Sequence, residues 1–299
     1  MTRIIRDPLV FDNICEVDIS LEGGADEARK QYEAGFLVLL RGRKLELDYD
    51  FLNSLNFNFE APEPVLRKVK KYGGSKILGL KTDSSDPIDR AIFNNVFHQD
   101  GEILARFQEQ VRTGNDQIVE IYKSVFPAYS DHRRVFTWRF TETLFENIHW
   151  DNFHIPEEFH QVRIFSNIDR SPRIWRISHR VDSYAESVYE TQSLSRFAGQ
   201  SGDDLVIHLN NEVLGGMTTP CMDRLPKHHV AFDQGDIWIC ETRIVSHQIY
   251  SGQRAVATMF FVDPATMDSP QSGFDERIRR LHERRRHASE STSRLLAGS

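Results

Sequence analysis

The chain has 299 residues, of which 39% are hydrophobic and 27% charged, so it can bury a sizeable core and has the composition of an ordinary globular protein. Its formal net charge of −7 excludes nucleic-acid binding driven by overall charge. Three scattered cysteines predict neither a disulfide framework nor a CxxC metal site, which fits a reducing compartment. We see no signal-peptide core and no apolar run near the roughly 20 residues of a transmembrane helix, so we expect a cytoplasmic protein.

The first 130 residues predict a mixed layer of helices and short strands. Residues 25–34 indicate a helix that ends at Gly35, and the apolar run 36–40 indicates a strand. Residues 101–127 have apolar positions at helical spacing, with an expected break near Thr113-Gly114-Asn115.

From about residue 132 the pattern changes to short segments rich in Val, Ile, Phe and Trp, bounded by turn residues. Strands are predicted at 133–140, 160–168, 173–179, 204–210, 228–232, 235–242 and 254–263. One helix is expected at roughly 182–199, and a basic helix at 274–290 follows a polar linker. The pattern predicts an α+β, mainly β chain whose core is a sandwich or barrel.

The stretch IHWDNF, residues 148–153, places His149 and Asp151 two positions apart in a segment of strand character. Alternate residues of an extended segment point to one face, so both side chains leave the backbone on the same side. Such a pair is either half of a metal site or a buried ion pair.

A second histidine occurs in the stretch 234–263. His247 follows a predicted strand, and Arg254 begins the next strand after a turn at 250–252. Two imidazoles and one carboxylate suit non-haem Fe(II) and leave coordination positions open. A chelating 2-oxo acid and O₂ would occupy those positions. The far carboxylate of the acid would need a cation, for which Arg254 offers a planar, always charged fork.

The motif HxD…H followed by an arginine, on predicted sandwich strands, resembles the Fe(II)/2-oxoglutarate-dependent dioxygenases. A closer resemblance, to the Kdo hydroxylases, rests on TWRF (137–140), HWDNF (149–153), VRIFSNID (162–169) and RIWRISH (173–179). It implies a double-stranded β-helix, a cupin-like jelly roll, beneath an N-terminal helical layer. It also implies Fe(II) on His149, Asp151 and His247, with 2-oxoglutarate and O₂ as cosubstrates. The implied reaction hydroxylates an aliphatic C–H, at the 3-position of Kdo (3-deoxy-octulosonate) in a lipid A or lipopolysaccharide precursor.

The arginines leave alternatives open. In many members of this superfamily the arginine lies about ten residues after the second histidine, whereas Arg254 lies seven after His247. Arg254 is the first candidate for the far carboxylate of 2-oxoglutarate, and Arg163 is the second. Three further arginines lie in strands expected to flank the metal: Arg139, Arg173 and Arg176. They would either face solvent and pair with carboxylates or bind an anionic substrate.

We expect one integrated domain in three parts: an N-terminal α/β layer (1–130), the jelly-roll core (131–265) and a basic C-terminal helix and tail (266–299). The basic stretch 276–287 is either a solvated surface helix or a contact with anionic lipid, where each basic residue gains roughly 1 kcal/mol. Lipid contact would place the protein at the periphery of the inner membrane.

Two other functions remain open from the sequence. One is a hydroxylase or desaturase of the same superfamily that acts on an amino acid or small metabolite. The other belongs to a different class: a non-catalytic β-sandwich that binds a sugar or an anion. His149→Ala would abolish turnover in an enzyme but leave ligand binding intact in a binding module.

Overall fold

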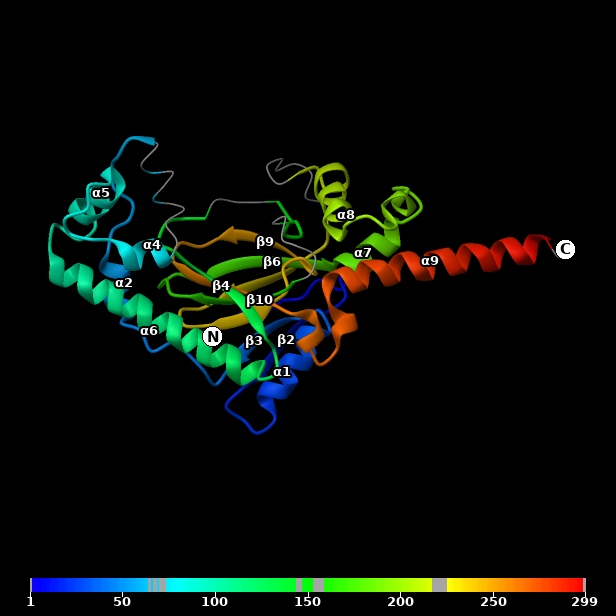
Figure 1. The fold of residues 1–299 in the computed structure, drawn as a ribbon, viewed down its shortest axis with the longest axis horizontal. Helices are drawn as coiled ribbons and strands as arrows, with labels where there is room; N and C mark the ends of the chain where they lie inside the picture. The colour runs from blue at the N-terminus through cyan, green and yellow to red at the C-terminus, as the bar shows by residue number, and fades with distance from the viewer. Residues whose placement is uncertain are drawn as a thin grey trace.

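A computed structural model describes residues 2–63, 66, 69, 74–143, 147–152, 159–216 and 225–297. Two β-sheets face each other in this part of the chain, with helices over the larger sheet and further helices at one end (Figure 1). The smaller sheet contains, in spatial order, β1 (Arg3–Ile5), β7 (His228–Phe232), β6 (Arg173–Arg180) and β9 (Val245–Ser251). The larger sheet contains β2 (Ile14–Asp18), β3 (Leu37–Arg41), β8 (Ile237–Cys240), β5 (His160–Asn167), β10 (Ala255–Val262) and β4 (Asp131–Arg139).

The N-terminal segment contributes strands to both sheets. β1 pairs antiparallel with β7, and β3 pairs antiparallel with β8, while β2 and β3 form a parallel pair. The segment 1–130 therefore completes the two sheets and is not only a layer outside them.

An aromatic core fills the space between the sheets. The rings of Phe232 and Trp238 stack with centroids 3.8 Å apart, and Trp175 meets Trp238 edge-on at 5.3 Å. These side chains come from both sheets and alternate along their strands with residues of the outer faces. This alternation identifies which residues of each strand point inward, toward the space that holds the site.

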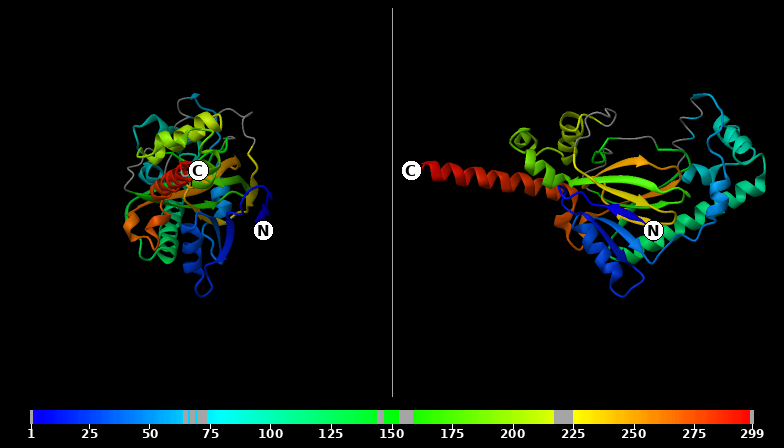
Figure 2. Two further views of the ribbon diagram at one scale, coloured as in Figure 1. Left: turned by 90° about the vertical axis from the view of Figure 1, so that its right-hand side faces the viewer. Right: turned by 180° about the vertical axis from the view of Figure 1, so that it is seen from behind.

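Helices of the N-terminal part pack on the outer face of the larger sheet and at one end of it. They are α1 (Gly24–Glu33) and the long α6 (Gly101–Val125) along the face, with α2 (Tyr49–Ser54), α4 (Gly74–Gly79) and α5 (Pro87–Asn95) gathered at the end where α6 begins (Figures 1 and 2). The expected break in α6 near residues 113–115 is wrong, because Gly114 and Asn115 both fit against the indole of Trp138. Asn115 Oδ1 accepts a hydrogen bond of 2.9 Å from Trp138 Nε1.

Gly114→Ala should destabilise the fold although alanine is the better helix former. A Cβ at residue 114 would lie 2.7 Å from the Trp138 ring. The helix-propensity gain is about 1 kcal/mol, and overpacking costs roughly 1–3 kcal/mol. We therefore expect a net loss of up to about 2 kcal/mol in the free energy of unfolding, measured in urea. Gly79→Ala is the matched control, because a Cβ there meets nothing within 4 Å. Equal effects of the two changes would show that Trp138 can move aside at little cost.

A second group of helices closes one end of the sandwich. It comprises α7 (Val181–Val188), the 3₁₀ turn η1 (Leu194–Phe197), α8 (Gly202–His208), the π-helical turn η2 (Leu209–Val213) and α9 (Phe274–Ala297). The predicted strand at 204–210 is wrong: Ser201 caps a helix there by accepting from the N–H of Asp203, and the apolar residues cover its buried face. The predicted helix at 182–199 is interrupted between Val188 and Leu194.

The basic C-terminal helix is present as predicted and continues to Ala297. It follows two 3₁₀ turns, η3 (Pro264–Thr266) and η4 (Pro270–Ser272). Its first turns bury Phe274, Ile278 and Leu281 against α7 and α8, and the rest extends away from the body (Figures 1 and 2). Within the placed residues, every helix is too short or too polar to cross a lipid bilayer.

Candidate metal centre

The two halves of the HxD…H motif meet at the free edge of the smaller sheet. His149 and His247 form a β-bridge, in which the N–H of His149 donates to His247 C=O at 3.1 Å and the reverse bond is 2.9 Å. The N–H of Asp151 donates to Thr242 C=O at 2.9 Å. Residues distant in the sequence are thus held in register by backbone bonds.

The three predicted ligands converge on one point. His149 Nε2 lies 3.4 Å and His247 Nε2 lies 3.8 Å from Asp151 Oδ1. All three side chains are buried, and their ligand atoms lie within 4.8 Å of one another. Ligands on adjacent positions of an ion, each about 2.1 Å from it, lie about 3 Å apart. A small inward movement would bring all three onto one ion.

The hydrogen bonds of the imidazoles fix which nitrogens are available. His149 Nδ1 lies 2.8 Å from Asn147 C=O, and His247 Nδ1 lies 3.2 Å from Val245 C=O. A carbonyl only accepts, so each Nδ1 carries a hydrogen, and in its neutral form each ring has its lone pair on Nε2. This arrangement orients a histidine ligand toward a metal.

The geometry favours a metal site over a simple ion pair. Burial lowers the pKa of His247 to about 4, despite the opposing effect of Asp151, so this ring is neutral near pH 7. A lone pair on Nε2 that faces a carboxylate oxygen is repulsive unless a cation lies between them. The donor set of two imidazoles and one carboxylate fits non-haem Fe(II).

Arg163, the second candidate for the cosubstrate, instead holds Asp151. Its guanidinium pairs with Asp151 Oδ2 and donates to Thr242 Oγ1 at 3.0 Å. Burial alone would raise the pKa of Asp151, but the guanidinium charge of Arg163 opposes this most strongly, and that pKa lies well below its usual range. Arg163 therefore keeps the carboxylate ionised while Oδ1 faces the histidines.

Arg254 lies on the wrong face of its strand for the role we predicted. Ala255 and Ala257 face the space between the sheets, so Arg254, one position before them, faces outward. Its guanidinium pairs with buried Asp169 at 2.9 Å and donates to Leu55 C=O at 2.9 Å. We therefore revise the prediction that Arg254 is the first candidate for the far carboxylate.

Arg139 and Arg173 point into the space between the two sheets, at the end away from His247. Arg139 lies opposite Ala255 in the register of β4 and β10. Arg173 lies two positions before Trp175 and therefore shares its inward face of β6. Both guanidinium groups donate to Thr143 Oγ1, at 3.0 and 3.3 Å respectively. Two strands and one loop thus place two cations around one hydroxyl.

For Arg176 the structure favours the first of the two alternatives, because the side chain faces away from the space between the sheets. It lies on the outer face of the smaller sheet, 3.8 Å above the Tyr250 ring, and donates to Gln248. Thr143 and Thr242 were not predicted as site residues, because a threonine beside a strand end carries no distinctive signal in the sequence.

A buried polar cluster lies behind Thr242. Glu241 accepts from the backbone N–H of Arg243 and of Gln161 at 3.0 and 2.9 Å, and His160 Nε2 lies 2.7 Å from the Tyr32 hydroxyl. Burial, reinforced by the cations of Arg243 and Arg277, holds the pKa of His160 well below its usual range. These buried hydrogen bonds hold residues 241–243 in place, and the carbonyl of Thr242 in this segment binds the N–H of Asp151.

His160→Gln should reduce the acid sensitivity of the fold. The unfolded chain takes up the proton of this histidine below about pH 6.5, whereas the folded chain does not. The free energy of unfolding therefore falls as the pH decreases below that value, by up to about 1.4 kcal/mol per pH unit. Urea unfolding of metal-free protein at pH 7 and pH 5 would measure the slope. The exposed His132→Gln is the control, and an unchanged slope in His160→Gln would contradict the assignment.

No family model matches the chain, and no curated protein matches it. Solved structures that match include the Kdo hydroxylase KdoO, described as a non-haem Fe(II) α-ketoglutarate-dependent dioxygenase. Its apo form has a TM-score of 0.61 at 15% identity, over 89% of this chain and 94% of that chain. Its complex with succinate and Fe(III) has a TM-score of 0.59 at 16% identity, over the same shares of the two chains.

This likeness shows the fold. The chain has the jelly-roll core of these dioxygenases, with two facing sheets and flanking helices, which confirms the predicted fold class. The likeness extends beyond residues 130–262, the part that carried the sequence resemblance, to nearly nine-tenths of the chain.

Proposed function

We propose that the chain is an Fe(II)- and 2-oxoglutarate-dependent dioxygenase that hydroxylates Kdo, at its 3-position, in a lipid A or lipopolysaccharide precursor. The observation that carries the proposal is the buried group of His149, Asp151 and His247, with both Nε2 atoms facing Asp151 Oδ1. The shared fold with Kdo hydroxylase structures supports the class of enzyme and suggests the substrate.

In this proposal His149, Asp151 and His247 hold the iron. Bound Fe(II) would supply the activation of O₂ that converts 2-oxoglutarate to succinate and CO₂ and oxidises the substrate. Arg163 keeps Asp151 ionised and oriented. The ring of Trp175 stacks on that of His247 with centroids 5.2 Å apart and would shield this side of the centre from water.

Arg139 and Arg173 are our assignment for the far carboxylate of 2-oxoglutarate. Ile174, next to Arg173, pairs with Ser251 at the end of β9, whereas His247 lies near its start. Four residues of strand span about 13 Å, which leaves room for a five-carbon diacid between the inward side chains. Two guanidinium groups and the Thr143 hydroxyl would bind the carboxylate by charge-assisted hydrogen bonds.

Succinate release with a panel of candidate substrates tests the proposed function. Kdo–lipid A should increase succinate formation well above the rate without substrate and yield a product heavier by one oxygen. Free amino acids should leave the rate unchanged. Stimulation by an amino acid and not by Kdo–lipid A would overturn the substrate and keep the class. No succinate under any condition would favour a binding protein.

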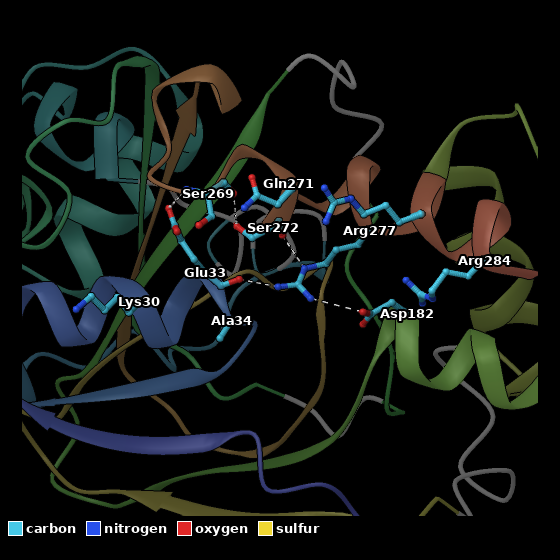
Figure 3. A pocket seen from close by; sticks show the side chains of 10 residues that line it. Lys30, Glu33, Ala34, Asp182, Ser269, Gln271, Ser272, Arg277 and Arg284 are labelled. Atoms are coloured by element: carbon cyan, nitrogen blue, oxygen red, sulfur yellow. Dashed lines mark hydrogen bonds and ion pairs between the residues drawn. The ribbon is translucent and has the colours of Figure 1, made fainter.

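Contact of the basic stretch 276–287 with anionic lipid stays a prediction. Figure 3 shows Arg277 reaching toward Asp182 and the backbone of Glu33, and its Nη2 donates to Glu33 C=O at 2.6 Å. Other arginines of the helix pair with acidic side chains: Arg279 and Arg280 with Glu276, Arg284 with Glu186, and Arg285 with Glu190. These ion pairs offset much of the positive charge of the helix that anionic lipid would attract.

Vesicle sedimentation would test lipid contact. We expect weak retention on phosphatidylglycerol vesicles, lost at 0.3 M salt, and none on phosphatidylcholine. Gln at the exposed positions Arg279, Arg280 and Arg286 should abolish retention without unfolding the helix base. Equal binding to both vesicles would contradict an electrostatic contact.

A further inference from the structure

The segment that carries His149 and Asp151 is extended like a strand, but it pairs with the smaller sheet through only a few backbone hydrogen bonds. Its backbone bonds to His247 and Thr242 all leave from one edge. Backbone groups of successive residues in an extended segment point to opposite sides, so those of Trp150 point away from β9. Within the described residues, no strand pairs with that second edge.

The side chain of Asn210 takes the place of the missing strand. The N–H of Trp150 donates to Asn210 Oδ1 at 3.1 Å, and Asn210 Nδ2 donates to Trp150 C=O at 2.7 Å. The amide thus makes the same reciprocal pair of bonds that a peptide group of a neighbouring strand would make. The side chain of Asn210 therefore satisfies both backbone polar groups of Trp150, the residue between His149 and Asp151.

Asn210 is itself fixed in position. It lies in the π-helical turn that follows α8, where Leu214 N–H donates to Leu209 C=O at 2.9 Å. Gly216 N–H donates to Asn210 C=O at 2.8 Å, and Asn147 Nδ2 donates to Gly216 C=O at 2.7 Å. The turn therefore reaches the HxD segment at Trp150 and at Asn147, the residue whose carbonyl orients His149.

The surroundings exclude water from these bonds. Trp150 has no exposed surface and Asn210 is 7% exposed. Ile148 and Trp150 pack into the core formed by α7, α8 and α9, while His149 and Asp151 face the opposite side. Without the amide, Trp150 would bury two unsatisfied backbone groups, and the segment would relieve this by leaving its extended conformation.

We propose that Asn210 is a positioning residue for the metal centre, which holds the backbone between His149 and Asp151 extended so that both side chains reach one ion. This inference rests on the proposed function, since it concerns the same site. Asn210 touches neither the metal nor the substrate in this account and acts through the ligand segment.

Metal affinity of the full chain tests the proposal directly. Co(II), which absorbs in the visible region when bound, would be titrated into metal-free protein. Asn210→Leu keeps the volume and removes both hydrogen bonds, and we expect its Co(II) affinity to fall by about 10- to 100-fold, the usual effect of losing a group that orients a ligand. Asn210→Asp keeps the acceptor for Trp150 N–H and loses the donor, so its affinity should lie between.

Asn115→Leu is the matched control. Asn115 is also a buried asparagine bonded to a tryptophan, Trp138, but lies on α6 behind the larger sheet. It should lose thermal stability to a similar degree and keep its Co(II) affinity and band shape. If Asn210→Leu does not fold, Asn210→Asp carries the test.

The outcomes separate the two proposals. Unchanged Co(II) affinity in the folded Asn210 variants would overturn the positioning role and leave the dioxygenase proposal standing. Absence of Co(II) binding by the unaltered protein would overturn the proposed function, and the inference with it. Weaker binding with an altered band in the Asn210 variants, and not in Asn115→Leu, would support both.

Discussion

Asp151→Asn will fold but bind metal too weakly to turn over. The amide keeps the size of the carboxylate and a carbonyl oxygen for Arg163, but it lacks the charge that a divalent ion requires. Loss of a group that merely orients a ligand already costs 10–100-fold, so loss of the ligand itself should exceed about 100-fold in affinity. Co(II) titration and succinate formation would measure the two effects.

Asp169→Asn provides the matched control for this variant. Asp169 is another buried aspartate paired with an arginine, Arg254, but its pair faces outward from the larger sheet. This change should lower thermal stability and leave Co(II) affinity intact. If Asp151→Asn bound Co(II) like the unaltered protein, the carboxylate would be a structural partner of Arg163 and not a ligand.

Arg173→Met will weaken 2-oxoglutarate binding while the metal still binds. A hydrogen bond to a charged group contributes about 1.5–3 kcal/mol, so we expect the dissociation constant to rise roughly 10- to 150-fold. Calorimetry on Co(II)-loaded protein would measure it. Arg173→Lys keeps the charge and loses the fork, and it should recover part of the affinity.

Arg254→Met separates this assignment from the one that the sequence favoured. Its loss leaves the buried carboxylate of Asp169 without a cation, so the thermal midpoint should fall. The affinity for 2-oxoglutarate should not change. The opposite result, with weak cosubstrate binding in Arg254→Met and normal binding in Arg173→Met, would restore Arg254 as the carboxylate ligand.

The three residues of the proposed metal centre could be picked out from the sequence because their chemistry is carried by residue type and by strand periodicity. His149 and Asp151 share a face for purely local reasons. His247 was picked out by residue type after a predicted strand, and in the structure it lies within β9. The strands β4, β5, β6, β7, β8 and β10 followed from the same alternation, whereas β9 was not among the predicted strands. These predictions needed no knowledge of which strands pair.

The roles of the arginines could not be predicted because they depend on strand register. A shift of one residue moves a side chain to the other face of a sheet, and the sequence around Arg254 does not fix that choice. Likewise, the apolar run at 204–210 suits a buried strand and a buried helix equally, and only the cap at Ser201 distinguishes them. Asn210 reaches Trp150 across sixty positions, which no local pattern indicates.

Anaerobic titration of Fe(II) and 2-oxoglutarate, followed by visible absorption, tests the central claim most directly. A 2-oxo acid chelated to Fe(II) gives a weak charge-transfer band. Our account predicts that the band appears in the unaltered protein and is absent in Asp151→Ala and His247→Ala. In Arg173→Met the band should require more 2-oxoglutarate. A well-folded protein that shows no band at saturating Fe(II) and 2-oxoglutarate would contradict the account, and His149 and Asp151 would then be a structural pair.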